Sequence, residues 1–345
     1  MSDKLGVMVV GPGWVAGQHL MSYAKDPRTE IRVIAGMPGI DKDEAQAKAY
    51  MEQYGFEAEF TTDYEKALQR DDIDIVGVCT INFLHYEQTV AALEAGKNVL
   101  TEKPLCFTMD EVKRLAKLTN EKGATTHVGH VARYYSAVRG LWQMVHHKNM
   151  IGKVFYAESD YWHEIIGPWK VVPKTGGSSL LMGGCHSVDM VRWMIGEDRE
   201  IDEVFGYTVP KHWRDDFEYD PTIALLMKYK DGAVGKVACS LECNMPYVFH
   251  IQVLGTEGTV RNNGICSEQV MDRHECKGWM SVPGMYMDDW DVAQHPFPTE
   301  VEYFVDCVEQ KKESELSFPH ALKTYEVIFA AEESAKTGKP VKLPL

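Results

Sequence analysis

The sequence predicts an α/β protein with two domains, and three observations lead to this prediction. Short apolar runs alternate with helical patterns over residues 1–125, whereas strand-like runs joined by turn signals follow from about residue 152. The chain has 345 residues, of which 45% are hydrophobic, so it is longer than one average domain and can bury a large core. We therefore expect one domain over residues 1–125 and a second over residues 126–345, with the final helices as candidates to pack back on the first.

The first domain is expected to contain a parallel sheet. Its strand candidates are residues 6–10, 31–35, 75–80, 98–101 and 125–128, and helical patterns between them cover residues 43–54, 64–70, 86–95 and 109–121. The alternation of strands and helices predicts parallel strands with helices on both faces of the sheet.

The second domain is expected to contain an antiparallel sheet. The runs "KVFYAESDYW", "TIALLMKYK", "AVGKVACSLE" and "HIQVLG" are strand-like, and "KDG" at 230–232 and "TEG" at 256–258 are turn signals between adjacent runs. Two helical patterns at residues 299–310 and 321–336 precede the end of the chain.

Charge and composition limit the kinds of partner that the protein can have. The chain carries 36 Lys and Arg against 51 Asp and Glu, a net charge of −15, which argues against nucleic acid or an anionic membrane as its main partner. The apolar run after Lys4 spans about six residues, too short for a signal sequence or a membrane span. We therefore expect a cytoplasmic protein that binds a small, uncharged molecule. Its eight scattered cysteines are interpreted as reduced thiols.

A glycine-rich motif follows the first apolar run. Residues 11–16, "GPGWVA", fit the pattern G-x-G-x-x-A, whose glycines let backbone amides approach a pyrophosphate at a helix N-terminus. The alternative is a plain tight turn, but the preceding strand favours dinucleotide binding. The residues expected at this cofactor site are Gly11, Gly13, Trp14, Val15 and Ala16.

The second strand ends without the acidic residue that commonly binds the adenosine ribose. Gly36 and Met37 occupy its tip, Asp41 comes later, and no arginine is present there for a 2′-phosphate. The missing basic group favours NAD as the cofactor, while NADP is not excluded.

Polar residues follow two later strands of the predicted parallel sheet. Thr80, Asn82 and His85 come after one of them, and Glu102 and Lys103 of "TEKPL" come after the next. Ligands bind at the carboxyl ends of strands in an open parallel sheet, so we expect all five residues at the cofactor site. The alternatives are a histidine that bonds the backbone at a helix start and a solvated surface lysine.

In this order, the motifs "GPGWVAG", "TINFLH" and "EKP" resemble those of the Gfo/Idh/MocA (glucose-fructose oxidoreductase / inositol dehydrogenase) family. The segment "GPWKVVPKTGGSSLLMGGCHSVDMVRWMIG" at 167–196 is similar to that family's double-glycine, His-x-x-Asp segment, and the resemblance covers essentially the whole chain. It implies an N-terminal Rossmann domain and a C-terminal α+β domain with a large open, mostly antiparallel sheet for substrate binding and homo-oligomerisation. It also implies nicotinamide-dependent redox chemistry on sugars, polyols or related molecules.

Two residues are candidates for catalysis. Oxidation of a secondary alcohol needs a base for the hydroxyl proton and a donor for the developing alkoxide. In the family, the lysine of E-K-P and the histidine of His-x-x-Asp frame the reacting carbon, and these roles carry over to Lys103 and His186. A buried histidine capped by Asp189, three residues later, is the alternative for His186.

The chain departs from the family pattern at Met182, where many relatives place an aspartate four residues before the histidine. This change indicates a less polar pocket, consistent with a substituted sugar or an aglycone. The run "YWHEIIGPWK" adds aromatic and polar side chains suited to sugar rings, although half of them could instead be core or interface residues. The residues expected to contact substrate are Arg133, Tyr161, Trp162, His163, Glu164, Trp169, Met182 and Asp189.

The sequence therefore predicts an NAD(P)-dependent enzyme that oxidises a ring hydroxyl of a sugar, polyol or glycoside to a ketone, or catalyses the reverse. Two alternatives stay open: a redox-neutral enzyme that cleaves glycosides by transient oxidation and elimination, and a non-catalytic dinucleotide-binding regulator. No metal is expected, because the scattered residues Cys239, Cys243, Cys266, His274 and Cys276 lack the paired spacing of a metal site.

Overall fold

The computed structural model describes residues 4–40, 42–271, 278–281 and 292–345, and it divides into two compact units. The first comprises Met1–Val131 with Pro296–Leu322, and the second comprises Ala132–His295 with Lys323–Leu345. The first unit continues past the expected division after residue 125 to Val131, and it includes a segment near the end of the chain, where the final helices were candidates to pack back on the first domain.

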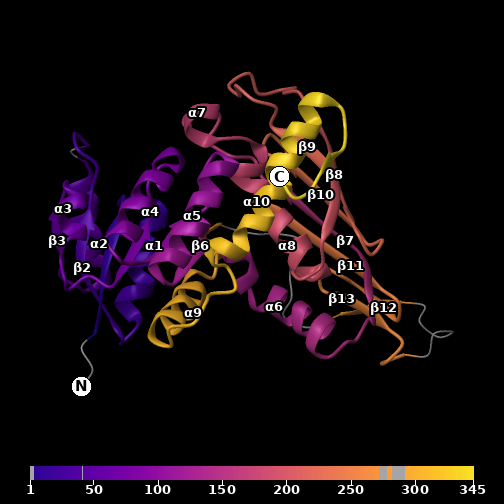
Figure 1. Cartoon of the computed structure of the whole chain (residues 1–345), viewed down its shortest axis with the longest axis horizontal. Helices are drawn as coiled ribbons and strands as arrows, with labels where there is room; N and C mark the ends of the chain where they lie inside the picture. Colours follow the sequence, from indigo (N-terminus) through magenta and orange to yellow (C-terminus); the bar gives the residue numbers. More distant parts are fainter. Residues whose placement is uncertain (1–3, 41, 272–277, 282–291) are drawn as a thin grey trace. The chain divides into compact units, whose positions relative to one another are not determined.

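The first unit is built on a six-stranded parallel sheet in the order β3-β2-β1-β4-β5-β6, of which Figure 1 labels β2, β3 and β6. The strands are β1 Leu5–Val10, β2 Thr29–Ala35, β3 Glu59–Thr61, β4 Ile75–Val78, β5 Asn98–Glu102 and β6 Thr126–Gly129. The helices between them are α1 Trp14–Lys25, α2 Lys42–Tyr54, α3 Tyr64–Leu68, α4 His85–Glu94, preceded by the 3₁₀ turn η1 Asn82–Leu84, and α5 Met109–Lys122. The predicted parallel Rossmann sheet is confirmed, with the short strand β3 as an addition.

Helix α9, Phe297–Glu309, explains why the chain returns to the first unit. It packs against α1, and its residues Val301, Phe304 and Val305 are fully buried in the same cluster as Val9 and Leu20. Burial of such side chains stabilises a domain by about 1.5–3 kcal/mol each, so the first unit needs this distant segment to complete its core.

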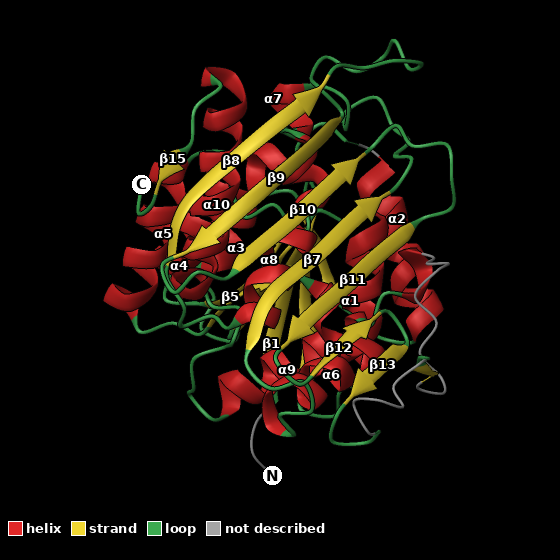
Figure 2. Ribbon diagram, turned by 90° about the vertical axis from the view of Figure 1, so that its right-hand side faces the viewer, coloured by secondary structure: helices red, strands yellow, loops and turns green. Residues whose placement is uncertain are grey.

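The second unit is built on a nine-stranded sheet in the order β14-β13-β12-β11-β7-β10-β9-β8-β15, which Figure 2 shows face-on. Its strands are β7 Val154–Trp162, β8 Ile201–Val209, β9 Thr222–Tyr229, β10 Val234–Ser240, β11 Val248–Gly255, β12 Gly258–Arg261, β13 Gly264–Ser267, β14 Met280–Ser281 and β15 Val341–Lys342. All neighbouring pairs are antiparallel except β7 and β10, so the expected large, mostly antiparallel sheet is confirmed.

One face of this sheet is covered by helix α8, Cys185–Ile195, which contacts β7, β10 and β11. Strand β9 shows the consequence, because Ile223, Leu225 and Met227 are buried while Ala224 and Leu226 are exposed. The remaining helical segments are η2 Val131–Tyr134, α6 Ser136–Trp142, η3 Gln143–His147, α7 Pro173–Gly176, η4 Leu180–Gly184, η5 Val292–Gln294 and α10 Phe318–Thr337.

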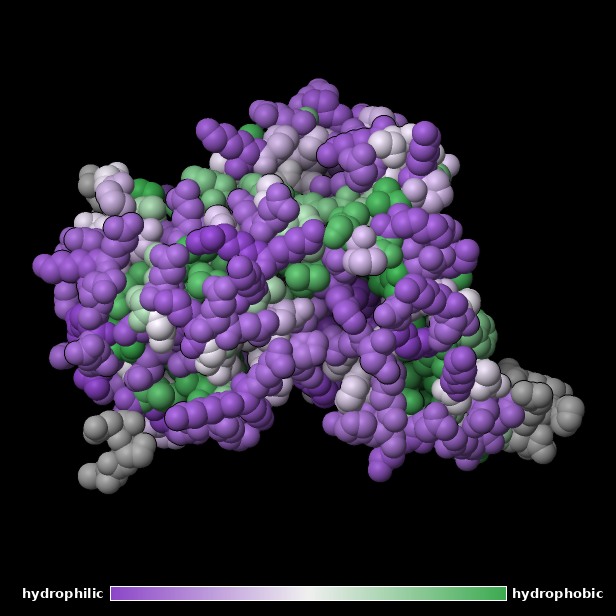
Figure 3. All heavy atoms as spheres, viewed as in Figure 1, coloured by the Kyte–Doolittle hydropathy of each residue, from purple (hydrophilic) through white to green (hydrophobic). Residues whose placement is uncertain are grey.

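The view in Figure 3 presents mainly hydrophilic side chains, as expected for a chain with 25% charged residues. Among the described residues, every helix is too short or too polar to cross a bilayer. Of the cysteines that the structure describes, six are free thiols, but Cys266 is disulfide-bonded, so the interpretation of all cysteines as reduced is wrong at that position.

Candidate active site

Three strands of the first unit end beside one another and form the base of a candidate cofactor site. Strands β1, β4 and β5 are consecutive in the parallel sheet, so their carboxyl ends share one edge. Strand order reverses between β1 and β4, since the chain passes from β1 to β2 on one side and later returns to β4 on the other. Ligands of open α/β sheets bind at such a switch point.

The glycine loop between β1 and α1 is shaped for close approach. Gly11 has φ +84, and a Cβ there would lie 2.5 Å from the side chain of Thr80. A Cβ on Gly13 would meet no atom within 4 Å, and among the described residues Gly13 caps α1 without a side-chain hydrogen bond. The first amides of α1 can therefore donate to an anionic group, and this loop fits the pyrophosphate of a dinucleotide.

The other residues of the glycine motif differ in exposure. Trp14 is exposed and Val15 is half-buried, whereas Ala16 is fully buried in the core of the first unit. Tyr50 of α2 donates a hydrogen bond to the carbonyl of Gly13 at 3.1 Å, which braces the loop from outside the motif. The sequence pattern contained no signal for this brace, because Tyr50 lies 37 positions away.

An acidic residue does lie near the tip of β2, although not at the position considered from the sequence. Asp43, in the first turn of α2, accepts a hydrogen bond from the amide of Met37 at 2.9 Å. Asp41 lies outside the described residues. Asp43 could have been identified from the sequence, because it lies in the first turn of the predicted helix, where carboxylates are favoured.

The residues after β4 contact one another and the β5 end. The Thr80 hydroxyl donates to Gln88 at 2.6 Å, and Asn82 is buried. The ring of His85 is 1% exposed, with Nδ1 at 2.7 Å from the carbonyl oxygen of Pro104 and Nε2 at 3.0 Å from that of Thr80. Burial lowers the pKa of His85, so the ring carries one proton at neutral pH, and we assign it to the shorter contact. His85 thus bonds the backbone, the alternative raised by the sequence.

Glu102 and Lys103 end strand β5. The Glu102 carboxylate is buried, and its Oε1 lies 2.9 Å from Nε2 of His19 on α1. Burial acts to raise the pKa of Glu102, but the hydrogen bond and charge of His19 keep this pKa below its usual value. The second oxygen accepts the backbone amide of Lys103 at 3.1 Å. Lys103 is half-buried, so it is not the fully solvated surface lysine that was the alternative.

In the second unit, His186 lies among aromatic side chains. It occupies the first turn of α8 and is 3% exposed, with the Tyr161 ring of β7 at 6.1 Å and nearly parallel. The Tyr161 hydroxyl is 3.0 Å from Nδ1 of His163, whose ring stacks on Tyr247 at 4.4 Å. Burial raises the pKa of Tyr161 well above its usual value, so this phenol stays protonated at neutral pH.

Arg133 and Asp189 form a buried ion pair in the second unit. Both carboxylate oxygens of Asp189 accept from Arg133, at 2.6 and 2.7 Å, and Arg133 also donates to Glu197 at 2.7 Å. The two side chains are only 1% and 2% exposed. These contacts favour a structural role over the substrate contact expected for the pair, because protein partners occupy both carboxylate oxygens.

The other expected substrate residues of the second unit differ in exposure. Met182 is 5% exposed in the π-helical turn η4 that precedes α8. Trp162 and Trp169 are half-buried, and Glu164 is exposed. The second unit therefore brings Tyr161, His163 and His186 together, whereas Lys103 belongs to the first unit.

Metal ligation has no support in the part of the chain that the structure describes, where no group of three His, Cys, Asp or Glu side chains could hold an ion. The thiol of Cys239 contacts the carbonyl of Ser179, and that of Cys243 contacts the carbonyl of Ser240. His274 and Cys276 lie outside the described residues.

Comparison with known families matches nearly the whole chain. Residues 5–130 match the Gfo/Idh/MocA model described as an oxidoreductase family with an NAD-binding Rossmann fold. Residues 147–343 match the C-terminal alpha/beta domain of the same oxidoreductase family.

Individual relatives are distant but extend over most of the chain. A 2,7-anhydro-N-acetylneuraminate hydratase of Mediterraneibacter gnavus is 25% identical over 81% of this chain and 70% of its own length. A scyllo-inositol 2-dehydrogenase (NAD(+)) of Bacillus subtilis is 23% identical over 99% of this chain and 97% of its own. A levoglucosan dehydrogenase solved with NADH and levoglucosan has the same fold, with a TM-score of 0.84 at 23% identity, and the match covers 99% of this chain and 100% of that one.

Proposed function

Because the chain belongs to the Gfo/Idh/MocA family of NAD-binding oxidoreductases, we propose that it oxidises a ring hydroxyl of a sugar, polyol or glycoside to a ketone, or catalyses the reverse. The observation that carries this proposal is the edge formed by the carboxyl ends of β1, β4 and β5. The glycine loop follows β1, and Lys103 follows β5, with β4 between the two strands. An oxidoreductase needs a group that stabilises the developing alkoxide beside its cofactor, and this edge would supply both the cofactor site and Lys103.

The first unit would hold the dinucleotide with its glycine loop. Gly11, Gly13 and the first amides of α1 would bind the pyrophosphate, with Trp14 and Val15 beside it and Thr80 and Asn82 at the next strand end. Bound NAD supplies the acceptor for the hydride that leaves the carbinol carbon.

Lys103 and His186 would handle the hydroxyl group. The Lys103 ammonium would donate a hydrogen bond to the hydroxyl oxygen and stabilise the negative charge that develops there. A ring nitrogen of His186 would take the hydroxyl proton, so that the carbon–oxygen double bond forms as the hydride leaves. In the reverse direction, the same nitrogen returns the proton to the alkoxide.

The expected substrate class rests on two kinds of support. The relatives named above include an inositol dehydrogenase and a levoglucosan dehydrogenase, whose names refer to a cyclic polyol and a sugar derivative. In the second unit, the Tyr161, His163 and Tyr247 rings form an aromatic cluster beside His186, and sugar rings stack well on such side chains. Buried Met182 adds an apolar group that suits a substituted sugar.

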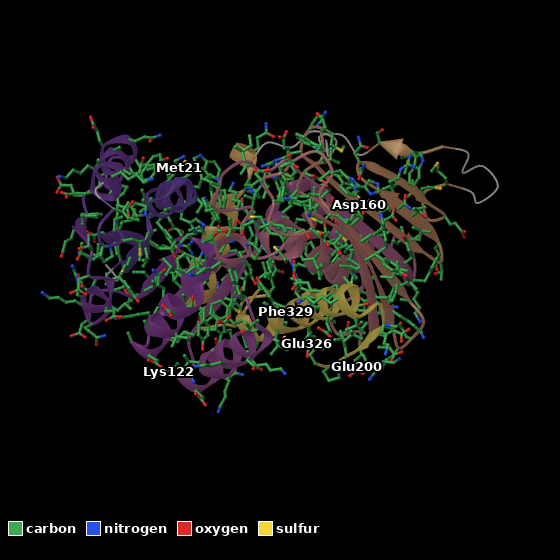
Figure 4. All side chains as sticks on the ribbon, turned by 90° about the horizontal axis from the view of Figure 1, so that it is seen from above. Met21, Lys122, Asp160, Glu200, Glu326 and Phe329 are labelled. Carbon is green, nitrogen blue, oxygen red and sulfur yellow. The ribbon has the colours of Figure 1, made fainter. Side chains whose placement is uncertain are left out.

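Self-association through the open face of the second unit's sheet is part of the same proposal. Tyr207 is 63% exposed and Leu226 is 50% exposed on the neighbouring strands β8 and β9. Asp160 of β7, labelled in Figure 4, bonds Lys236 of β10 at 2.6 Å and adds a charged pair to the sheet. Replacing Leu226 by Glu should lower the mass measured by light scattering, whereas an unchanged mass would place the interface elsewhere.

A redox-neutral reaction is the second candidate, because one relative is named as a hydratase. In this case the ring hydroxyl is oxidised only transiently, the neighbouring C–H becomes acidic, and a substituent is eliminated before the hydride returns. Net NADH formation distinguishes the two candidates, since it accompanies turnover only in the dehydrogenase.

The test is mass spectrometry of the purified protein for a bound dinucleotide, followed by a panel of sugars, polyols and glycosides read at 340 nm and by product analysis. We expect NAD and a substrate that produces NADH. Product without NADH would identify the redox-neutral reaction, and tight NAD binding without any product would identify a non-catalytic regulator.

A further inference from the structure

We propose that two buried histidines, His19 and His85, position Lys103 by holding the residues on either side of it. The inference rests on the catalytic role proposed for Lys103. All the residues concerned belong to the first unit, and neither histidine ring is exposed enough to meet a substrate, at 0% and 1%. They are therefore positioning residues.

The contact before Lys103 runs through Glu102. Nε2 of His19 donates to one carboxylate oxygen at 2.9 Å, and the other oxygen accepts the Lys103 backbone amide at 3.1 Å. The carboxylate also rests against Gly129 of β6, where an added Cβ would lie 3.1 Å from it. A charged acceptor makes stronger hydrogen bonds than a neutral one, so this contact holds the Lys103 amide firmly to α1.

The contact after Lys103 runs through Pro104. Nδ1 of His85, the first residue of α4, donates to the Pro104 carbonyl at 2.7 Å, and the same ring lies 3.0 Å from the Thr80 carbonyl at the end of β4. Pro104 has no amide of its own, so its carbonyl is the backbone group available to hold this segment. The ring thereby links the β4 end to the residue that follows the lysine.

The two contacts act on the same short segment from different helices. Lysine has a long, flexible side chain, and the position of its ammonium depends on where the backbone begins it. A misplacement of about 1 Å can cost about a hundredfold in rate, while cofactor binding through the glycine loop should be unaffected. Loss of either contact should therefore lower kcat and leave the affinity for NAD nearly unchanged.

The test pairs disruptive and conservative variants. His19→Leu and His85→Leu remove the donors, whereas His19→Gln and His85→Asn keep an amide donor near the position of the bonding nitrogen. We expect the Leu variants to lose about tenfold to a hundredfold in kcat, with the Kd for NAD within about threefold of wild type, and the amide variants to recover most of the loss. Gly129→Ala, which presses on Glu102 without removing a polar group, should lower kcat in the same way.

His127→Leu is the matched control. His127 is also fully buried in the first unit, but its ring contacts Ser314 at 2.7 Å and Glu300 at 3.3 Å. It should lower thermal stability and leave kcat within about threefold. The inference is overturned if His127→Leu loses as much kcat as the other Leu variants, or if kcat and NAD affinity fall together. It is also overturned if Gly129→Ala has the kcat of wild type and the amide variants have the kcat of the corresponding Leu variants.

Failure of the proposed function would be seen separately. If Lys103→Ala turns over as fast as wild type, Lys103 is not catalytic and the function proposal fails at that residue. If Lys103→Ala is inactive while the histidine variants keep full kcat, only the positioning inference fails.

Discussion

Two buried carboxylates, Glu102 of the first unit and Asp189 of the second, lie near predicted catalytic side chains in the sequence but have different partners. Glu102 precedes Lys103 directly, and it bonds both His19 and the Lys103 amide. Asp189 follows His186 by three positions, yet both its oxygens accept from Arg133. Glu102 therefore bonds the residue that follows it in the sequence, whereas the main partner of Asp189 is 56 positions away.

The two carboxylates differ in the kind of side chain that binds them. An arginine binds a carboxylate through two parallel hydrogen bonds and is always charged, and Asp189 gives both oxygens to Arg133, with the Thr324 hydroxyl as a further donor to Oδ1 at 3.3 Å. A histidine offers one nitrogen to Glu102 and leaves the second oxygen for another donor. Glu102 thus holds the amide of the residue that follows it, whereas Asp189 is held mainly to Arg133.

The largest expected effect comes from breaking the arginine pair. Asp189→Asn leaves the Arg133 charge buried with Glu197 as its remaining carboxylate partner among the described residues, and it should lower the free energy of unfolding by about 3–5 kcal/mol. Thermal unfolding measures this loss, with Glu200→Gln, an exposed residue labelled in Figure 4, as a control with an unchanged midpoint. A stable Asp189→Asn variant with an altered pH profile would instead make Asp189 a partner of His186.

Replacement of Lys103 tests the residue whose amide Glu102 binds. Lys103→Ala should lower kcat by about a hundredfold or more, because a charge-stabilising donor is lost, while NAD stays bound. Lys122→Ala, at an exposed site labelled in Figure 4, should leave kcat unchanged. Activity within a few-fold of wild type would remove Lys103 from the mechanism.

A third buried carboxylate, Glu300 of α9, extends the comparison, because its Oε1 lies 3.3 Å from Nε2 of His127. Burial, with the Glu102 charge adding to it, raises the pKa of Glu300 well above its usual value, so the folded state holds a proton that the unfolded state releases. The stability that this bound proton contributes is complete below the ordinary carboxyl pKa of about 4.3. It is lost as the pH rises through the raised pKa of the folded state.

The stability of Glu300→Gln relative to wild type should therefore increase as the pH rises from 5 to 8. Denaturant unfolding at several pH values measures the difference. Glu302→Gln, exposed on the same helix, should show no such trend. Equal pH dependence in Glu300→Gln and wild type would show that Glu300 is ionised in the fold.

His186 can be tested by placing a new carboxylate at position 182. Met182→Asp restores the carboxylate of the family pattern, and an ionised aspartate that reaches the ring should favour the imidazolium. The lower limb of the kcat/KM profile should then move by about one unit to higher pH. His186→Ala should flatten that limb, and a limb unchanged in both variants would make His186 structural.

The smallest effect concerns the half-buried carboxylate of Asp43 near the tip of β2. With no arginine at this tip, we expect a preference for NAD over NADP of roughly tenfold or less, to which the negative charge of Asp43 contributes. Asp43→Asn keeps an acceptor for the Met37 amide but removes the charge, so titration should show the preference reduced. A thousandfold preference in wild type would mean that another group contacts the ribose.

Much of the fold followed from local patterns in the sequence. The glycine motif, the strand–helix alternation and the "KDG" and "TEG" turns predicted the parallel sheet and the antiparallel hairpins, because apolar periodicity and turn chemistry act over a few residues. Strand β3 was missed since it has only three residues, all partly exposed, and β8 was missed since its second half is exposed.

The partners of buried charges were decided only by the tertiary structure. His19 lies 83 positions from Glu102, and Arg133 lies 56 positions from Asp189. Short motifs named Lys103 and His186 as candidates, but they carry no information on which distant side chain will neutralise a nearby carboxylate. A buried charge must be paired to be stable, and the pairing is set by which helices pack together when the core forms.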